Sequence, residues 1–479
     1  MKLILHADCT TVTIDGRVSW ETLDAVDRLL TFNEPGAFFT PQYKRGLWDG
    51  KRRLFKAKDQ SFPVGLLDRV TSLFERSNLD VEIVDERPIP WESPPAPITR
   101  LHGFRTTEGE WVDLEPDQAD SLRAFLESPR GCLELPTAAG KTEIAAALFK
   151  TLPEHVCLLL VDRKGILSQT AERLRGRLRE PIGLIGDGHR DTSKRVTVAT
   201  IQSLWHHYES MRKKFFPHVN VVCVDECHSI SPKMWFQTLE VIPASIRLGL
   251  SGTIKEATRR MIVESYLGPI VHTQQITDLI ELGRVATPNI AMHRVGGLFD
   301  DAQDPTWAYW HGIVQHRQRN ELIADAAALC QAQKKPVLIL CVRIPHGHIL
   351  QEILQAKLHC DVPFLYGQTP LDVIDQTKRE LEDGHIPAII ASTIFDKGQD
   401  LPAVRALILA GGQRSALLTI QRVGRALRRK WSGENTADIL DFFDAGHRNL
   451  RSQAEDRRRT YTRKNLNPRT IASLDEWFK

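Results

Sequence analysis

Short apolar runs alternate with amphipathic stretches over most of the chain, from about residue 100 onward. Runs of Val, Leu and Ile bounded by polar residues are typical of strands buried in a parallel sheet, and helical periodicity between them predicts connecting helices. The expected strands fall into two groups, 156–161, 196–199, 221–224 and 248–250 for one sheet, and 337–341, 388–391 and 406–410 for another. The pattern predicts an α/β protein with two parallel-sheet domains in tandem.

The first 88 residues have a different pattern. Strands are expected at 3–5, 11–14 and 81–84, with a helix opened by Ser19 and another over 66–74. Five prolines between residues 88 and 97 predict an extended linker. We therefore expect a small α+β N-terminal domain ahead of the two parallel-sheet domains.

The chain has 479 residues, a length suited to about three domains. A Gly-, Asp- and Pro-rich stretch predicts a hinge between the two α/β domains. The expected plan is an N-terminal domain at 1–88, a linker at 89–100, a first α/β domain at 101–291, a hinge at 292–309 and a second α/β domain at 310–479 that ends in a basic helical tail.

Charge and hydropathy narrow the class of protein. The 63 Lys and Arg residues against 60 Asp and Glu leave a net charge of only +3. Any contact with nucleic acid must therefore be local. No apolar run reaches the roughly eighteen residues of a membrane-spanning helix, and residues 1–9 are too short and polar for a signal peptide. We expect a cytoplasmic protein without a membrane partner.

The eight cysteines include no Cys-x-x-Cys pair. Cys157, Cys223 and Cys341 lie in apolar strand-like runs, where cysteine acts as a small buried hydrophobic residue in a reducing compartment. A zinc site formed by Cys223, Cys227 and His228 is the alternative. Strand alternation and the acidic segment around them already account for these residues, so no zinc is expected.

Residues 135–142 read Leu-Pro-Thr-Ala-Ala-Gly-Lys-Thr and open a predicted helix. Backbone N–H groups at a helix N-terminus bind phosphates. The Lys141 ammonium can reach the outer two phosphates and the Thr142 hydroxyl can ligate Mg2+. The strict pattern has glycine five residues before Gly140, where this chain has Leu135. The segment predicts a phosphate loop for ATP.

Residues 224–228 read Val-Asp-Glu-Cys-His directly after an apolar run. Asp225 is suited to hold Mg2+ together with Thr142. Glu226 is then the candidate to orient and deprotonate the attacking water. With the phosphate loop, this segment predicts ATP hydrolysis that depends on Mg2+. A surface turn beside an unrelated acidic strand end is the alternative.

A basic segment downstream disfavours that alternative. Residues 421–428 read Gln-Arg-Val-Gly-Arg-Ala-Leu-Arg, and helical spacing sets Gln421, Arg425 and Arg428 on or near one face. A lone cluster of this kind is usually a solvated basic face. Because this one follows the apolar run at 406–410, we predict that Arg425 and Arg428 stabilise the transition-state charge of phosphoryl transfer.

These segments and their order resemble the motifs of superfamily 2 helicases and translocases. Further matching segments are 161–170, 199–204, 251–253, 337–342 and 392–402. The chain departs from the usual motifs at three places: Ala138 stands for a glycine, Gly252 stands for an alanine, and 161–170 lacks a common proline. The resemblance implies two RecA-like parallel-sheet motor domains in tandem, preceded by the small α+β domain.

Two stretches resemble one subgroup. Residues 267–288 are similar to the exit of the first motor domain in the XPB and UvsW group of DNA repair helicases, and residues 43–55 to the leading domain of UvsW-type phage helicases. This implies a DNA motor that unwinds, regresses forks and migrates branches in recombination, repair or replication. A prokaryotic or phage-infected cytoplasm is implied as well, and a monomer is favoured.

The resemblance also implies site residues. Those implied for the nucleotide are Gln118, with Trp111 as a stacking partner, Thr137, Gly140, Lys141, Thr142, Asp225, Gly398, Asp400 and Gln421. Those implied to couple hydrolysis to movement are His228, Ser251 and Thr253. Those implied to contact single-stranded DNA are Gln169, Thr200, Gln202 and Thr393, with Arg163 and Arg343 as further candidates.

The leading domain is implied to engage DNA through Lys44, Arg45, Trp48, Lys51, Arg52 and Arg53. The alternative is a solvated basic face around a core tryptophan. The C-terminal basic residues, Arg448, Arg457, Arg458, Arg459, Arg463 and Lys464, either contact phosphates or only solubilise a helix.

Three other functions stay open: an RNA or RNA-DNA helicase, the motor subunit of a restriction or nuclease system, and a catalytically silent DNA-binding module. The complete set of expected ATP-site residues disfavours the last of these.

Overall fold

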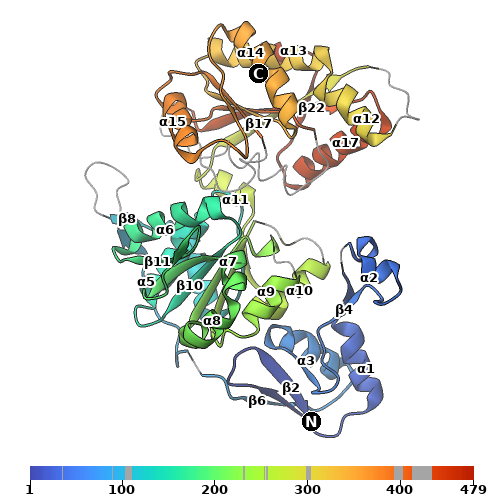
Figure 1. Ribbon diagram of the computed structural model, residues 1–479, viewed down its shortest axis with the longest axis vertical. Coiled ribbons are helices and arrows are strands. Elements are labelled where there is room, and N and C mark those ends of the chain that lie inside the picture. The colour runs from blue at the N-terminus through green and yellow to red at the C-terminus, as the bar shows by residue number, and fades with distance from the viewer. Residues whose placement is uncertain are drawn as a thin grey trace. The chain divides into compact units, whose positions relative to one another are not determined.

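The computed structural model describes residues 1–34, 36–88, 90–102, 111–229, 232–252, 254, 257–297, 304–392, 403–412 and 434–478 (Figure 1). The chain forms two compact units. One comprises Met1–Leu135 and Gly140–Gln274, and the other Pro136–Ala139 and Gln275–Lys479. None of the helices in the described ranges has the length and hydropathy of a membrane span.

The leading domain, drawn in blue in Figure 1, is built on a four-stranded sheet in the order β5-β2-β1-β6. Ser19 caps α1 by accepting the Thr22 backbone N–H, as predicted. The other expected elements are also present. The main elements are β1 (Lys2–Leu5), β2 (Thr11–Asp15), α1 (Trp20–Leu29), β5 (Ser61–Pro63), η2 (Val64–Leu66), α3 (Leu67–Arg76) and β6 (Glu82–Asp85).

A small hairpin extends from this domain, between α1 and β5 in the sequence. Its strands are β3 (Thr31–Asn33) and β4 (Lys51–Arg53), which pair antiparallel. Between them lie the short helices η1 (Ala37–Phe39) and α2 (Pro41–Lys44). Figure 1 shows α2 projecting beyond β4, away from α1 and α3.

The leading domain packs directly on the first α/β domain. A Cβ atom at Gly65 would lie 1.9 Å from the Glu264 carbonyl oxygen, so only glycine permits this approach. The Arg69 guanidinium Nη2 lies 2.5 Å from Glu264 Oε2, and that carboxylate is almost fully buried. Apolar side chains of both domains belong to one continuous core. The proline-rich segment at 88–97 therefore does not keep the two domains apart.

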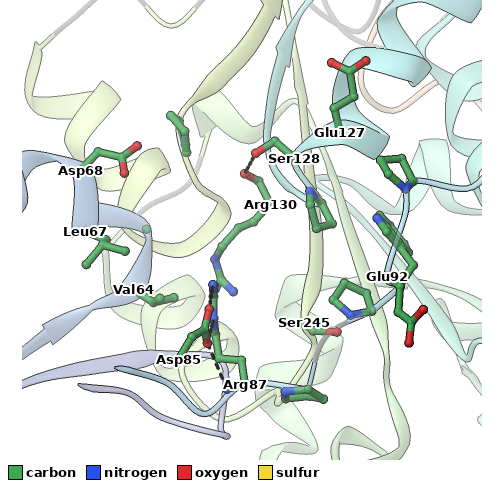
Figure 2. Close-up of a pocket in the computed structure, with 17 residues that line it drawn as sticks. Val64, Leu67, Asp68, Asp85, Arg87, Glu92, Glu127, Ser128, Arg130 and Ser245 are labelled. Atoms are coloured by element: carbon green, nitrogen blue, oxygen red, sulfur yellow. Dashed lines mark hydrogen bonds and ion pairs between the residues drawn. The ribbon is translucent and has the colours of Figure 1, made fainter. Parts of the chain in front are cut away.

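Figure 2 shows the cavity that remains where the two domains meet. It has a volume of about 460 Å³. Arg87, paired with Asp85 in the leading domain, and the buried Arg130 of the first α/β domain line it. Pro90 and Pro94 of the proline-rich segment also line this cavity. That segment therefore runs along the contact between the domains.

The first α/β domain contains an eight-stranded sheet in the order β12-β11-β13-β10-β14-β15-β9-β16, parallel except for β12. The four predicted strands are confirmed within two residues. The strands are β9 (Arg130–Glu134), β10 (Cys157–Val161), β11 (Ile182–Gly186), β12 (His189–Arg190), β13 (Val196–Thr200), β14 (Val221–Asp225), β15 (Ile246–Ser251) and β16 (Ile270–Thr273). A separate hairpin of β7 (Arg100–His102) and β8 (Trp111–Asp113) precedes them.

Helices connect these strands, as the periodicity predicts. They are α4 (Pro116–Glu127), α5 (Lys141–Thr151), α6 (Lys164–Leu178), α7 (Ile201–His206), α8 (Tyr208–Lys214), η3 (Phe216–His218), η4 (Cys227–Ser229), α9 (Pro232–Leu239) and α10 (Ala257–Leu267). Because the strands are parallel, the segments after β9, β10, β13 and β14 all leave the sheet at its carboxyl edge.

The second unit contains a seven-stranded parallel sheet in the order β19-β20-β18-β21-β22-β17-β23. Its strands are β17 (Thr287–Val295), β18 (Val337–Leu340), β19 (Phe364–Leu365), β20 (Ala388–Ala391), β21 (Ala406–Leu409), β22 (Thr436–Asp444) and β23 (Arg469–Ile471). Its helices are α11 (Ile276–Glu281), α12 (Pro305–Tyr309), η5 (Trp310–Val314), α13 (Arg317–Ala332), α14 (Ile344–Leu358), α15 (Leu371–Glu382), α17 (Arg448–Arg463) and η7 (Leu474–Glu476).

The boundary between the α/β domains differs from the expected one. The second unit begins at Gln275, and β17 pairs with β22 along its whole length. The expected hinge at 292–309 therefore overlaps the end of β17 and all of α12. Asn289, His293 and Arg294 interrupt the apolar pattern of β17, which is why the sequence did not indicate a strand there.

Candidate active site

The phosphate-loop segment connects β9 to α5 at the carboxyl edge of the first sheet. Gly140 has φ +82°, and a Cβ atom there would lie 2.1 Å from Gln118 Nε2. Glycine is therefore required both for the backbone conformation and for the close side chain. Ala138, at the place of the usual glycine, also has a positive φ of 75°. A left-handed alanine costs about 1–2 kcal/mol, so the loop holds its shape against local strain.

Gln118 supports this loop from α4. Its side chain is 4% exposed, and its Oε1 accepts the backbone N–H of Glu115 at 3.0 Å. The same amide group lies against Gly140. Gln118 thus caps α4 and braces the glycine of the loop, while its contact with adenine stays a prediction.

Trp111 lies in a place that does not suit the expected adenine stacking. Its ring stacks on His102 with centroids 4.1 Å apart, and Lys150 Nζ lies 5.0 Å above it. Lys150 is nine residues beyond Lys141 on α5, about 14 Å along the helix axis. Trp111 is therefore near the end of α5 opposite the phosphate loop.

Lys141 is joined to the acidic segment by an ion pair. Its Nζ lies 2.9 Å from Glu226 Oε1. His228 Nδ1 lies 3.1 Å from Glu226 Oε2 and 3.0 Å from Ser251 Oγ. One network therefore connects the phosphate loop, the acidic segment after β14 and the end of β15. Sequence reasoning selected all four residues but did not predict that they touch.

The backbone of the acidic segment is unusual. Glu226 has φ +49°, and its N–H donates to Asp225 Oδ1 at 3.0 Å. In this turn the Glu226 carboxylate pairs with Lys141, while the Asp225 carboxylate accepts the Glu226 N–H. Such a conformation in a residue with a side chain persists only where its surroundings hold it, and it is frequent at functional sites.

Electrostatic interactions shift the pKa values of the two carboxyl groups in opposite directions. Burial raises the pKa of the Asp225 carboxyl to about 6, and the nearby Glu226 charge acts in the same direction. Burial also opposes ionisation of Glu226, but the Lys141 ammonium and the His228 side chain outweigh it and hold the Glu226 pKa below its ordinary value. For Lys141, the Glu226 and Asp225 charges overcome burial and raise its pKa. Lys141 and Glu226 are therefore both charged.

Thr142 and Asp225 fit the requirements of a magnesium site. Thr142 lies in the first turn of α5 and Asp225 is the last residue of β14, and both side chains are partly exposed. Hydroxyl and carboxylate oxygens are ligands that Mg2+ prefers. Within the described residues no three His, Cys, Asp or Glu side chains are grouped to hold a metal.

Two residues of this region were missed. Arg259 on α10 donates from Nη1 to the His228 carbonyl oxygen at 2.5 Å, which fixes the backbone after Glu226. Glu134, at the end of β9, accepts the Ile254 N–H at 3.0 Å and so ties the start of the loop to the segment after β15. Glu134 could have been selected from the sequence, because it is a charged residue directly before the phosphate loop. No sequence pattern indicated Arg259.

Several predicted residues lie outside the described residues, so their positions stay predictions. They are Thr253, Thr393, Gly398, Asp400, Gln421, Arg425 and Arg428. Thr137 is described and lies partly exposed in the loop before Gly140.

The candidates for strand contact on the first α/β domain have different exposures. Gln169 on α6 is exposed, and so is Gln202 on α7, whose Nε2 donates to the Asp162 carbonyl oxygen at 3.3 Å. Arg163 is exposed at the start of α6. Thr200 is 1% exposed, and its hydroxyl caps α7 and donates to Ser203 Oγ. A side-chain contact from Thr200 to DNA is therefore not supported.

In the leading domain, part of the basic cluster is neutralised. Arg52 Nε lies 2.5 Å from Glu34 Oε2, and Arg53 Nη2 lies 2.7 Å from Asp49 Oδ2. Trp48 is half-buried, and its Nε1 donates to the Lys51 carbonyl oxygen at 2.8 Å. Lys44, Arg45 and Lys51 are exposed and remain candidates for phosphate contact.

The C-terminal basic residues also lie in different environments, some buried and some exposed. Arg457 on α17 is buried, and its Nε lies 2.9 Å from Asp441 Oδ2. It is a core ion pair and not a phosphate contact. Lys464 donates to Gln275 Oε1 at 2.8 Å. Arg459 forms ion pairs with Glu455 and Asp456 at 3.8 and 3.7 Å, and the Arg458 guanidinium lies 5.8 Å from the centre of the Phe443 ring. Arg448 and Arg463 are exposed. Arg343, a further candidate for contact with single-stranded DNA, is exposed at the start of α14.

The first sheet carries a glycine-lysine loop at a helix start after β9 and a pair of adjacent carboxylates at the end of β14, with β15 between these two strands. Together with two parallel-sheet domains, these features define a phosphate-loop ATP hydrolase. Family models agree. Residues 112–256 match the type III restriction enzyme res subunit, and residues 313–430, which include 421–428, match the helicase conserved C-terminal domain. The chain belongs to the superfamily 2 helicases and is an ATP-hydrolysing enzyme of that superfamily, as the motifs predicted.

Individual relatives share much of the chain. The DNA 3′-5′ translocase XPB2 of Sulfurisphaera tokodaii is 25% identical over 383 residues, which cover 72% of this chain and 85% of the relative. The ATP-dependent DNA helicase uvsW of Enterobacteria phage T4 is 22% identical over 471 residues, which cover 93% of this chain and 91% of the relative.

Solved structures confirm the predicted fold. Dbp5 of S. cerevisiae, bound to RNA and ADP BeF3, superposes with a TM-score of 0.55 at 16% identity and covers 76% of this chain and 91% of its own. The two α/β domains thus have the RecA-like fold in tandem, as predicted.

Proposed function

We propose that this protein is an ATP-dependent DNA helicase or translocase that remodels branched DNA by unwinding, fork regression and branch migration. The observation that carries the proposal is the network of Lys141, Glu226, His228 and Ser251, which links the phosphate loop to the segments that transmit hydrolysis in this superfamily. The relatives named as a DNA translocase and a DNA helicase support DNA as the substrate.

The Lys141–Glu226 ion pair suggests how ATP starts the reaction. Without nucleotide, Lys141 neutralises Glu226 and keeps its pKa low, which makes Glu226 a weak base. Phosphate oxygens compete for Lys141, because they carry more negative charge than one carboxylate. When Lys141 turns to the phosphates, Glu226 loses its nearest cation and becomes more basic. It is then able to accept a proton from the attacking water.

Thr142 and Asp225 would hold Mg2+ in this scheme. The ion supplies charge that neutralises the phosphate oxygens when it is bound. The raised pKa of Asp225 is consistent with a carboxylate placed to receive a cation, since a neighbouring positive charge would stabilise its ionised form.

We further propose that Arg425 and Arg428 stabilise the transition state, with Gln421, Gly398 and Asp400 completing the nucleotide site. Gln169, Gln202 and Thr393 are proposed to contact the strand backbone, which gives binding without sequence preference. Thr253 is proposed to couple hydrolysis to movement together with His228 and Ser251. A phage relative favours a role in a prokaryotic or phage-infected cytoplasm.

ATP turnover with different nucleic acids tests the proposal. The purified protein is given single-stranded, duplex, forked and four-way DNA, and matching RNA, in parallel. We expect strong stimulation by DNA, greatest with forked or four-way substrates, and Glu226→Gln serves as the inactive control. Equal or greater stimulation by RNA would replace the DNA assignment with the RNA helicase alternative. Equal stimulation by all DNA forms would remove the branched-DNA assignment.

A further inference from the structure

The hairpin of the leading domain exposes large apolar side chains. We call residues 36–50, between β3 and β4, the projection. Within it, Phe38 is 57% exposed, Phe39 71% and Leu47 75%. The two phenylalanine rings lie together with centroids 4.1 Å apart. Isolated exposed apolar residues are normal on protein surfaces, but adjacent ones on a small element commonly mark a binding surface.

The projection has an ordered backbone of its own. The Glu34 N–H donates to the Gly50 carbonyl oxygen at 2.8 Å and closes its base, while Ala37 is buried. Thr40 caps α2, and the Leu47 N–H donates to the Gln42 carbonyl oxygen at 3.0 Å. Phe38, Phe39 and Leu47 are therefore held outward by hydrogen-bonded structure. Ordering of these side chains costs less on binding when the backbone is already fixed.

Trp48 supports the projection from inside. Its half-buried ring donates a hydrogen bond to the Lys51 carbonyl oxygen, at the start of β4. It joins the last turn of the projection to the strand. Phe38 and Phe39 are more exposed than Trp48 and are therefore better placed to stack on a base.

The positive charge of the residues around these rings favours a nucleic acid as the binding partner. Residues 34–53 contain five basic and two acidic side chains, a net charge of +3, equal to that of the whole protein. Both acids pair with Arg52 or Arg53. Lys44, Arg45 and Lys51 are exposed and form no ion pair with any residue that the structure describes. Aromatic faces next to unpaired cations are the combination that binds nucleic acid strands.

We propose that Phe38 and Phe39 stack on unpaired bases at the junction between single and double strands of DNA, with Leu47 packed against them, while Lys44, Arg45 and Lys51 bind the adjacent phosphates. Base faces are covered in a duplex and become accessible only where pairing ends. The projection thus recognises the branch point. This inference rests on the proposed DNA function and assigns part of the branch specificity to one element.

The test replaces both rings, as Phe38→Ala with Phe39→Ala in the full-length protein. Trp20→Ala is the matched control, because Trp20 is an equally exposed aromatic, 73%, on α1 and outside the projection. Phe39→Trp is a rescue variant that retains an aromatic face. Each protein binds a synthetic fork carrying 2-aminopurine at the junction, and the same DNA strands as plain duplex. Circular dichroism checks that each variant folds.

We expect the double variant to lose affinity for the fork on the order of tenfold, because base stacking contributes that much per contact. Its duplex affinity should fall less, and the junction 2-aminopurine signal should no longer change on binding. Trp20→Ala should match the wild type, and Phe39→Trp should retain fork binding.

Three results would overturn the proposal: fork binding like that of the wild type, equal losses on fork and duplex, or a change in molecular mass by light scattering that identifies the rings as a protein contact. If the wild type itself shows no preference for forks and no DNA-stimulated ATP turnover, the proposed DNA function is contradicted. That result is distinct from failure of the projection alone.

Discussion

At the residue scale, Lys141 and Glu226 have opposite tasks although they form one ion pair. Lys141 is proposed to bind phosphates and Glu226 to take a proton, although the two side chains lie 2.9 Å apart. Glu226 has a left-handed backbone, and its carboxylate pairs with Lys141, while Asp225 Oδ1 accepts the Glu226 N–H. Substitutions at these two positions should therefore affect different steps.

Lys141→Ala should abolish nearly all nucleic-acid-stimulated ATP turnover and weaken ATP binding, while DNA affinity changes little. Glu226→Gln should retain binding of ATP and Mg2+ but slow hydrolysis, on the order of 10²–10⁴-fold, because its shape remains and the base is lost. Steady-state turnover and a fluorescent-nucleotide titration measure both effects. Unchanged turnover in Lys141→Ala, or lost ATP binding in Glu226→Gln, would show that the roles are misassigned.

Binding of Mg2+ should depend on pH through Asp225. Its pKa is raised to about 6, so protonation below pH 6 removes the charge that attracts the cation. Affinity for the magnesium–ADP complex should rise as pH increases through 6. Glu226→Gln removes the neighbouring negative charge, so the midpoint of this rise should move to lower pH. Calorimetric titrations of both proteins across this range compare the midpoints. Coincident midpoints would contradict the assignment.

Local motifs made part of this site predictable. Lys141, Thr142, Asp225 and Glu226 lie in contiguous segments whose chemistry is recognisable in isolation. Burial depends on partners distant in the sequence, so it was not predictable that Thr200 is covered or that Arg457 faces Asp441. The contact of Arg259 with the His228 carbonyl was missed for the same reason.

At the element scale, the predicted strands were confirmed, whereas two core strands interrupted by charged residues were not predicted. The strand Ala388–Ala391 was predicted with its observed bounds, whereas β17 and β22 were not predicted. β22 carries three buried aspartates, Asp438, Asp441 and Asp444, which lower its apparent hydropathy. Arg457 and Arg319 pair with Asp441 and Asp444 inside the second unit. These charges are compensated locally, which is why they are tolerated in a core strand.

Arg457→Ala should destabilise the second unit by about 3–5 kcal/mol, because it leaves the buried Asp441 without its cation. Only Tyr461 would still donate to that carboxylate from α17, at 2.9 Å. Arg463→Ala is the matched control, since Arg463 is exposed on the same helix. Urea unfolding measures both free energies. A loss no greater than that of the control would mean that Asp441 finds another partner, and a selective loss of DNA affinity would restore the phosphate role of Arg457.

At the scale of the whole molecule, the leading domain and the first RecA-like domain form one compact unit. Their shared apolar core, the Arg69–Glu264 ion pair and the close approach of Gly65 connect them. Removing residues 1–88 would expose this core, so a truncated motor should aggregate rather than behave as an independent enzyme. Point substitutions at the contact are better suited to test how the domains cooperate.

Gly65→Ala should loosen this contact, because the added Cβ atom meets the Glu264 backbone at 1.9 Å. We expect a destabilisation on the order of 1–3 kcal/mol from overpacking. Gly176→Ala is the control: Gly176 lies in α6 with open space around its Cβ position, so alanine should be neutral or slightly stabilising there. Thermal unfolding and limited proteolysis of the proline-rich segment measure the difference. Equal stability of the two variants would mean that the domains separate freely.

Conversion of a synthetic four-way DNA junction, followed in real time by fluorescence transfer, measures whether ATP hydrolysis drives branch movement. The wild-type protein should migrate the branch only with ATP and Mg2+, and Glu226→Gln should bind the same junction without moving it. Absence of ATP-dependent conversion by the wild type, or equal conversion by Glu226→Gln, would contradict the account of an ATP-driven motor for branched DNA.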